Sequence, residues 1–242
     1  MTRLRYVYAI CRPLDAPLQA ELTGVGGVPP ALLHHQGLVA VVSKVPETEF
    51  DEEVLLAHLE DAEWRAAAVR AHEGVIDALT TVTTPLPLRL ATVVPDDSGV
   101  RTMIESRGAA FRRILDRLEG RLEWGVRMYL EPGTEPGTEP ETGTGLGEGS
   151  ESAEPVPAGA VVFARSVHER LARYAEDSRL HAPHHVETSE VPGRKVLDAA
   201  YLVPRADCEK FVELVDRAKD EAPGLRVELS GPWAAYSFTG EA

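Results

Sequence analysis

Three histidines, His181, His184 and His185, lie within five positions of one another. Imidazole nitrogens bind transition metals, and a metal-bound water can attack a substrate, so this segment could serve a metal hydrolase. Apart from Glu187, however, no cysteine or acidic residue stands beside them at a ligand-like spacing. The passage from a loop into a strand is the simpler explanation, and we predict no metal site.

His72 and Glu73 begin a pattern similar to the zinc motif HExxH, but residue 76 is Ile and the second histidine is missing. Arg89, in the next extended segment, is the natural partner for Glu73. A Glu–Arg pair between a helix and a strand is more often structural than catalytic. We therefore predict that Glu73 and Arg89 form a structural polar lock.

Gly24, Gly26 and Gly27 lie in the segment LTGVGGVPP, which we expect to form a flexible loop. The segment lacks GxGxxG, and Pro29-Pro30 forbids the helix that would receive a pyrophosphate. A pocket at residues 22–30 could still bind a small ligand. The sequence contains no P-loop, GxSxG or CxxC motif, so we predict no catalytic residue and no cofactor.

The only tryptophans are Trp64, Trp124 and Trp233. The first two stand among charged residues, in AEWRAA and LEWGVR. Core packing explains such positions, and so does an apolar surface for a partner protein, because tryptophan is enriched at binding hot spots. All three are candidates for partner contact.

Composition restricts the class of protein. The formal net charge is -14, with 25 Lys and Arg against 39 Asp and Glu. Because binding to nucleic acid needs a basic face, we expect no nucleic-acid partner. No apolar run is long enough to span a membrane. The apolar run near the N-terminus is broken by Arg12 and Pro13 and is too short for a signal peptide. Cys11 and Cys208 lie far apart in sequence, and neither has a CxxC or zinc-like spacing, so we expect two reduced thiols. We expect a cytoplasmic protein.

Apolar periodicity and turn residues predict two α+β domains, 1–119 and 120–242. In the first we expect strands Arg5–Cys11, Ala31–His35 and Leu38–Ser43, a helix Glu52–Thr80 capped by Asp51, an extended Leu86–Val94, and a helix Val100–Leu118 ended by Gly120. Gln36-Gly37 is a hairpin signal between the second and third strands.

The second domain shows the order strand, helix, strand, strand, helix, strand, which is the ferredoxin-like order. We expect a strand Leu122–Leu130, a helix Ala160–Leu180, strands His185–Val191 and Lys195–Val203, a helix from Asp207 to Lys219, and extended segments Leu225–Leu229 and Ala235–Phe238. Residues 131–158 form an acidic insertion with seven glutamates and no Lys or Arg, and this composition predicts disorder.

Six segments occur in order along residues 5–238: RYVYAI, GLVAVVSKVP, AHEGVIDAL, PLPLRLATV, LEWGVRMYL and GPWAAYSF. Together they resemble the GvpL/GvpF family of gas vesicle proteins, with the acidic insertion as the main departure. The family motifs look structural. Glu123 and Trp124 are expected to begin the second domain, and Gly231, Pro232 and Trp233 to lock its final strand.

The resemblance implies an accessory, minor structural component of the gas vesicle, located in the cytoplasm with the vesicle. It also implies a role in nucleation or chaperoning of the hydrophobic major shell protein, with that protein and other accessory proteins as partners. The family has no established activity or cofactor and a variant ferredoxin-like second domain. There are two rival hypotheses. One is a ferredoxin-like regulatory module that binds a small ligand, and the other is a metal hydrolase.

Overall fold

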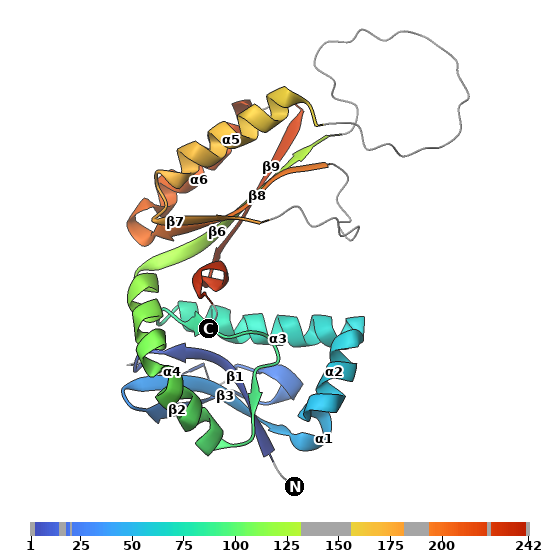
Figure 1. Cartoon of the computed structure of the whole chain (residues 1–242), viewed down its shortest axis with the longest axis vertical. Coiled ribbons are helices and arrows are strands. Elements are labelled where there is room, and N and C mark those ends of the chain that lie inside the picture. Colours follow the sequence, from blue (N-terminus) through green and yellow to red (C-terminus); the bar gives the residue numbers. More distant parts are fainter. Residues whose placement is uncertain are drawn as a thin grey trace, which may run out of the picture. The chain divides into compact units, whose positions relative to one another are not determined.

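The computed structural model describes residues 3–14, 18–19, 21–131, 156–181, 194–221 and 224–240. The chain divides into two compact units, drawn in Figure 1. Unit 1 contains Met1–Glu123 and Pro232–Ala242, and unit 2 contains Trp124–Gly231. The sequence places 120–242 in one domain, whereas the last segment belongs to unit 1, where the Glu123 side chain binds Ser237.

Unit 1 is built on one antiparallel sheet with the order β2-β3-β1-β4, and β5 also pairs with β1. Its strands are β1 (Arg3–Cys11), β2 (Ala31–His35), β3 (Leu38–Pro46), β4 (Leu86–Pro87) and β5 (Val93–Val94). Gln36 and Gly37 have φ values of 47° and 72°, which a tight hairpin turn requires, so the predicted hairpin is confirmed.

Helices cover both faces of this sheet (Figure 1). They are α1 (Glu47–Phe50), α2 (Glu52–Glu60), α3 (Ala62–Thr80) and α4 (Asp97–Leu118), together with the short 3-10 helices η1 (Val25–Gly27) and η3 (Tyr236–Phe238). Strand β1 is buried from Arg5 to Cys11, as expected for a central strand covered on both faces. The segment Ala235–Phe238, expected to be extended, contains η3 instead.

The predicted helix Glu52–Thr80 is two helices, because the chain becomes extended at Asp61. Asp61 accepts hydrogen bonds from the backbone N–H groups of Glu63 (2.8 Å) and Trp64 (3.0 Å) and so caps α3. Asp51 precedes α2 but its side chain makes no capping bond. Apolar periodicity runs through the break, which is why the pattern alone predicts one helix.

The predicted extended segment Leu86–Val94 is two short strands with a turn between them. Both strands pair with β1, Leu86 opposite Ile10 and Val93 opposite Tyr6. Ala91 has a φ of 64°, so the chain loops away from β1 between them. The backbone N–H of Ala91 donates to the Tyr6 hydroxyl (3.1 Å), which fixes this loop.

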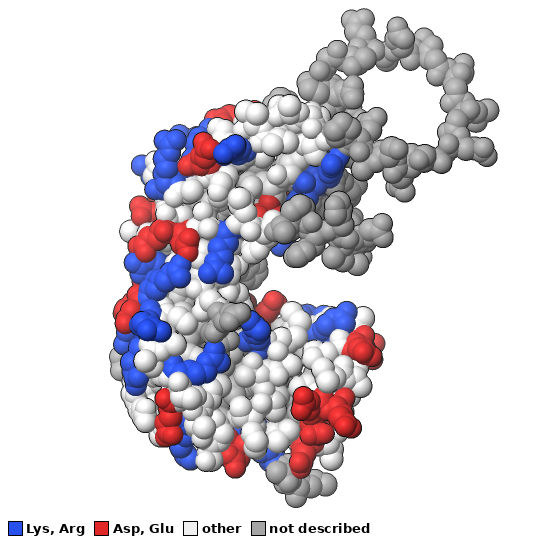
Figure 2. Space-filling view, in the orientation of Figure 1, with Lys and Arg blue, Asp and Glu red and all other residues white. Residues whose placement is uncertain are grey.

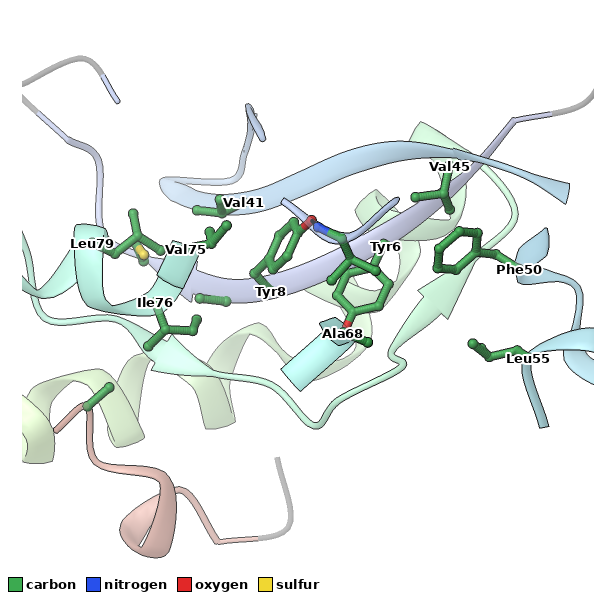
Figure 3. Packing of buried hydrophobic residues seen from close by; sticks show 14 residues of the cluster. Tyr6, Tyr8, Val41, Val45, Phe50, Leu55, Ala68, Val75, Ile76 and Leu79 are labelled. Carbon is green, nitrogen blue, oxygen red and sulfur yellow. Dashed lines mark hydrogen bonds between the residues drawn. The ribbon is translucent and has the colours of Figure 1, made fainter. Parts of the chain in front are cut away.

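Two tyrosines of β1 lie at the centre of the core of unit 1 (Figure 3). The rings of Tyr6 and Tyr8 are 4.9 Å apart, and Tyr6 also meets Phe50 edge-on. Val75, Ile76 and Leu79 of α3 are fully buried against this cluster. The Tyr6 hydroxyl hydrogen-bonds to His72 and the Tyr8 hydroxyl to Ser43, so the apolar core also contains buried polar side chains that are hydrogen-bonded.

Unit 2 is a four-stranded sheet in the order β7-β8-β6-β9 with two helices. Its elements are β6 (Arg121–Leu130), α5 (Ala158–Ala172), β7 (Asp177–Leu180), β8 (Arg194–Pro204), a 3-10 turn η2 (Arg205–Asp207), α6 (Cys208–Glu221) and β9 (Leu225–Trp233). The buried side chains Val126, Tyr201, Phe211 and Val215 belong to its core.

Four predictions for this unit need correction or lie outside the described residues. The helix expected to reach Leu180 ends at Ala172, because Asp177–Leu180 forms β7 and pairs with β8. The expected strand His185–Val191 and the insertion residues 132–155 lie outside the described residues. Gly231, Pro232 and Trp233 are the last three residues of β9, rather than a turn that locks a later strand onto this unit.

Candidate functional site

His72 of α3 is the most deeply buried histidine of the described chain, with 2% of its surface exposed. Its Nδ1 lies 3.0 Å from the Tyr6 hydroxyl, and the ring lies near Tyr8 and Tyr236. Burial lowers the pKa of His72 to about 4, and the neighbouring Leu88 backbone opposes this shift. His72 is therefore neutral at neutral pH.

The other ring nitrogen, Nε2 of His72, is also buried, and the Leu88 backbone interacts with the ring. His72 lines a cavity of about 260 Å³ inside unit 1, which we call the His72 cavity. Its other lining residues are Val69, Glu73, Leu88, Arg89, Leu90 and Tyr236.

Glu73 and Arg89, the predicted polar lock, both line this cavity and are both exposed. Among the ion pairs of the described residues, none joins these two side chains. The structure thus brings the two residues to one cavity, and their pairing stays a prediction. The sequence singles out His72 only as part of an incomplete HExxH pattern, since a lone histidine on a helix gives no sign of its burial.

Acidic side chains surround the hydroxyl of Tyr236 at the same place. Burial raises the pKa of Tyr236, and the carboxylates of Glu73, Asp77 and Glu123 raise it further. Burial also raises the pKa of Asp77. The local potential around Tyr236 is therefore negative, with Arg89 as the cation among the residues that line the cavity.

A second cavity, of about 370 Å³, lies between the glycine loop and α3. Thr23 to Gly27 form one wall, and Trp64, Ala67, Ala68 and Ala71 form the other; we call it the Trp64 groove. Its loop is held in place, contrary to the expected flexibility. The Val25 N–H donates to the Tyr8 hydroxyl (2.9 Å), and the Gly24 N–H donates to the Val28 carbonyl (2.9 Å).

Gly24 itself is required by this arrangement. A Cβ at position 24 would lie 2.2 Å from the Tyr8 hydroxyl oxygen and 2.9 Å from the Val28 carbonyl oxygen. Tyr8 in turn donates to Ser43 Oγ (2.9 Å), which donates to the Val28 carbonyl (3.1 Å). The glycine therefore allows β1 and the loop to approach closely, and no phosphate-binding role is needed to explain it.

The three tryptophans have different environments. Trp64 is half-buried at the Trp64 groove, where its ring stacks on His58 with centroids 4.9 Å apart. Trp233 is 45% exposed. Trp124 is 9% exposed, packs near Phe211 and donates from Nε1 to Cys208 Sγ at 3.4 Å. The prediction of partner contact is therefore corrected for Trp124, a core residue of unit 2.

Unit 2 has a groove of about 840 Å³ between α5 and the strands β7 and β8. Val161, Ala164 and His168 of α5, Leu180 of β7 and Val196 and Leu197 of β8 line it. We call it the α5–β8 groove. Val161 and Leu180 are 49% and 62% exposed, and the adjacent Val162 is 68% exposed. The groove thus presents apolar side chains to water.

Charged residues lie along the same groove in short-range pairs. Arg165 pairs with Glu169 at 3.4 Å, and Lys195 pairs with Asp198 at 2.7 Å. His168 Nδ1 lies 2.8 Å from the Tyr201 hydroxyl, and burial lowers the pKa of His168. The arrangement is an apolar floor with paired charges around it, which suits binding better than catalysis.

Neither a metal centre nor a membrane-spanning helix is found in the part of the chain that the structure describes. No group of three or more His, Cys, Asp or Glu residues could hold a metal ion there. Of the three clustered histidines, only His181 lies in that part, and it lines the α5–β8 groove. None of the described helices combines the length and the apolar character needed to cross a bilayer.

Comparison with known proteins gives consistent results. Residues 4–240 match the family model described as "Gas vesicle synthesis protein GvpL/GvpF". Gas vesicle protein L from Streptomyces sp. (strain CB03234) is 50% identical, over 98% of this chain and 93% of that protein. Gas vesicle protein F from the same strain is 25% identical, over 96% of this chain and 98% of that protein.

Two solved structures share the fold. The crystal structure of GvpF from Anabaena sp. PCC7120 superposes with a TM-score of 0.72 at 18% identity, covering 98% of this chain and 96% of that chain. GvpF from Microcystis aeruginosa gives a TM-score of 0.69 at 15% identity, covering 99% of each chain. The chain belongs to the GvpL/GvpF family of gas vesicle synthesis proteins.

Proposed function

We propose that this chain is an accessory protein of gas vesicle assembly that binds the hydrophobic shell subunit in the cytoplasm before or during assembly. Family membership supports a role in the gas vesicle. The shell of a gas-filled compartment must be apolar on its inner side, to keep liquid water out. Before assembly such a surface aggregates unless another protein covers it.

The observation that carries the proposal is the exposed apolar lining of the α5–β8 groove. A protein that exposes Val161 and Leu180 around one hollow loses hydrophobic stabilisation that burial would provide. Contiguous apolar surface of this kind marks interaction sites on soluble proteins. An apolar segment of the shell subunit would cover these side chains.

The charged residues around the groove fit the same role. Arg165–Glu169 and Lys195–Asp198 are pairs at the periphery of the apolar floor. Protein interfaces combine an apolar centre with a polar rim, and an exposed ion pair such as Arg165–Glu169 contributes little stability by itself. This pair can therefore adjust to a partner at little cost while the apolar side chains provide the affinity.

The acidic character of the chain would keep such a complex dispersed. The formal net charge is -14, and Figure 2 shows acidic side chains gathered over α1 and α2, which carry Glu47, Glu49, Glu52 and Glu53 in their first turns. Like charges on separate complexes repel one another. A helper protein with an acidic exterior thus limits the aggregation of its apolar client.

We also propose that unit 2 is a variant ferredoxin-like domain. Its elements follow the order β6, α5, β7, β8, α6, β9, and its sheet has the order β7-β8-β6-β9. This succession supports the assignment. On this proposal the groove lies beside the first helix of the domain and its second and third strands.

Co-expression and affinity capture test the function. Leu180→Glu and Val161→Glu place charges in the α5–β8 groove and should reduce capture of the hydrophobic shell subunit at least tenfold. Val82→Glu is the matched control, since Val82 is an exposed valine of unit 1 that lines none of the cavities described above. Equal capture by wild type, groove variants and control would refute the proposal.

The Trp64 groove supports a second candidate function, the binding of a small ligand. It occupies the predicted pocket at residues 22–30, and Ala67, Ala68 and Ala71 leave room beside the Trp64 ring. A thermal-shift screen with metabolites would detect it, because a ligand that binds the folded state raises the melting temperature. Stabilisation by one compound that Ala67→Trp removes would favour this function.

A further inference from the structure

Strand β9 forms one edge of the sheet of unit 2. In the order β7-β8-β6-β9 it has β6 on one side, and no strand of the described chain pairs with its other side. Such an edge presents a row of backbone N–H and C=O groups to which another strand can bind. The first proline of β9 is Pro232, so every residue of Leu225–Leu229 has an N–H group to donate.

Two contacts fix the register between β6 and β9. The Glu131 N–H donates to the Gly224 carbonyl (3.0 Å). At the other end of the strands, a Cβ at Gly125 would lie 2.5 Å from Ser230 Oγ, so these two residues are cross-strand neighbours. Both contacts fit one antiparallel register, without a bulge between them.

This register shows which backbone groups of β9 face outward. Backbone groups of an antiparallel strand point alternately to its two sides. Gly224 bonds towards β6, so the even-numbered residues after it also face β6, and three residues present their N–H and C=O groups to the outer side: Leu225, Val227 and Leu229. The side chain of Val227 is buried in the core of unit 2, and those of Leu225 and Leu229 pack partly exposed against this core.

The side chains of β9 make the strand complementary to a second copy of itself. Two copies that pair antiparallel about a two-fold axis at Val227 place Leu225 opposite Leu229. The same register places Arg226 opposite Glu228 on both sides of the axis. The outward backbone groups then bond to each other. The charged residues take the positions without backbone hydrogen bonds, where opposite side chains approach more closely.

The neighbouring two-fold registers fit less well. An axis at Arg226 or at Glu228 brings like charges face to face, which is destabilising. An axis at Leu229 places Arg226 opposite Pro232. Glu228 then faces Ser230, so neither charge meets an opposite one. The charge pattern therefore selects the axis at Val227.

The two charged side chains are accessible to a partner. Arg226 Nε lies 3.3 Å from Glu228 Oε1 of the same chain, and their side chains are 31% and 37% exposed. The Arg226 guanidinium also lies over the Tyr129 ring, 4.8 Å from its centroid. Pairing about Val227 would add the same two charges of the second copy, which gives a network of four alternating charges.

The opposite edge of the sheet is less suited to this role. Strand β7 has only four residues. The His181 N–H donates to the Asp198 carbonyl of β8, so the backbone groups of Ser178 face outward. Asp177 Oδ1 accepts the Ser178 N–H at 2.8 Å, which leaves this group occupied by a side chain.

We propose that two copies of this chain associate through β9, by antiparallel pairing of Leu225–Leu229 about a two-fold axis at Val227. The pairing joins the two four-stranded sheets into one and covers the partly exposed side chains of Leu225 and Leu229. A five-residue strand pair is a small interface, so the dissociation constant should be about 10 to 100 μM. The association needs no shell subunit and is independent of the proposed function.

Sedimentation velocity of the full chain between about 5 and 500 μM tests the association. Wild type should pass from monomer to dimer over this range. Glu228→Arg brings like charges face to face twice in each dimer and should raise the dissociation constant about tenfold or more. Arg226→Glu combined with Glu228→Arg restores opposite charges and should return the constant to within about threefold of wild type.

Glu213→Arg is the matched control for the charge change. It makes the same substitution in an exposed ion pair of unit 2, Glu213 with Arg217 on α6, and should leave the association unchanged. Circular dichroism of each variant confirms that it is folded.

Hydrogen exchange of the wild-type amides, followed by NMR, tests the register without any variant. The N–H groups of Leu225, Val227 and Leu229 should exchange more slowly at high than at low chain concentration, because only the dimer binds them. Those of Arg226 and Glu228 bond to β6 and should be protected equally at both concentrations.

Three results would overturn the proposal. The first is a wild-type chain that stays monomeric at the highest concentration. The second is a folded Glu228→Arg chain that dimerises as wild type does, or a folded double variant that associates no better than Glu228→Arg. The third is a dimer in which the outward N–H groups exchange at the same rate at both concentrations.

Discussion

Glu123 binds Ser237 through both of its carboxylate oxygens. Oε2 accepts the backbone N–H of Ser237 at 2.8 Å, and Oε1 accepts the Ser237 hydroxyl at 2.6 Å. Only 8% of Glu123 is exposed, so these bonds satisfy a buried charge across 114 positions of sequence. They attach the segment around Ser237 to Glu123, the residue at which the chain leaves unit 1.

Removal of the Ser237 hydroxyl should weaken this attachment. Because the acceptor is a buried carboxylate, Ser237→Ala should lower the free energy of unfolding by about 1 to 2 kcal/mol, measured by urea denaturation. Ser106→Ala is the control, since its hydroxyl bonds only to the Met103 carbonyl on an exposed helix face. Equal losses in the two variants would contradict the role given to Ser237.

The break between α2 and α3 depends on Asp61. Asp61→Ala should lower the melting temperature more than Asp51→Ala, because only Asp61 accepts capping hydrogen bonds. These bonds to the Trp64 and Glu63 N–H groups hold the pKa of Asp61 below its usual value. Since the folded state favours the carboxylate, the stabilisation is present above the unfolded pKa of about 4.

As the pH falls from about 4 through the lower folded pKa of Asp61, wild type and Asp61→Ala should converge in stability. Thermal unfolding followed by circular dichroism at several pH values checks this. A difference between them that stays constant down to pH 2 would show that the carboxylate is not the source of the effect.

The buried His72 makes the stability depend on pH in a higher range than Asp61 does. Its folded pKa is about 4 and its unfolded pKa is 6.5, so below pH 6.5 only the unfolded state takes up the proton. Stability should therefore fall as the pH falls from 6.5 towards 4. From pH 7.5 to pH 5 the loss from this group is about 2 kcal/mol in the free energy of unfolding.

Urea denaturation at the two pH values tests this loss in wild type, His72→Gln and His34→Gln. The loss should shrink in His72→Gln, where the group that takes up the proton is absent. It should persist in His34→Gln, because His34 is exposed on β2. An unchanged pH dependence in His72→Gln would assign the loss to other groups.

The tryptophan environments can be read by fluorescence. A chain that keeps only Trp124, with phenylalanine at positions 64 and 233, should emit at short wavelength and resist quenching by acrylamide, because this ring is 9% exposed. A chain that keeps only Trp233, which is 45% exposed, should emit at longer wavelength and be quenched readily. Similar quenching constants would contradict the burial described for Trp124.

The acidic composition of residues 132–155 suggests a solubilising contribution. Deletion of these residues removes six glutamates and no Lys or Arg. The shortened chain should keep its thermal unfolding midpoint and its capture of the shell subunit, while its solubility falls. A loss of capture by a folded deletion variant would instead indicate a direct contact role for this segment.

The sequence predicted the elements whose signals are local. The hairpin around Gln36-Gly37 follows from turn chemistry, and the apolar stripe of α4 follows from contacts three and four residues apart. The helix break at Asp61 and the strand Asp177–Leu180 were missed. In the first case the periodicity continues across the break, and in the second a short polar strand forms because β8 lies beside it.

The sequence by itself determined family membership, since six ordered segments suffice for it, and it determined the central strand and the hairpin of unit 1. Only the tertiary structure decided that the chain returns to unit 1 and binds Glu123, that Trp124 is a core residue, and that His72 is buried beside the Tyr6 hydroxyl. Local patterns record interactions between near neighbours in sequence. Burial and pairing across 66 or 114 positions depend on how the elements pack, which no local pattern contains.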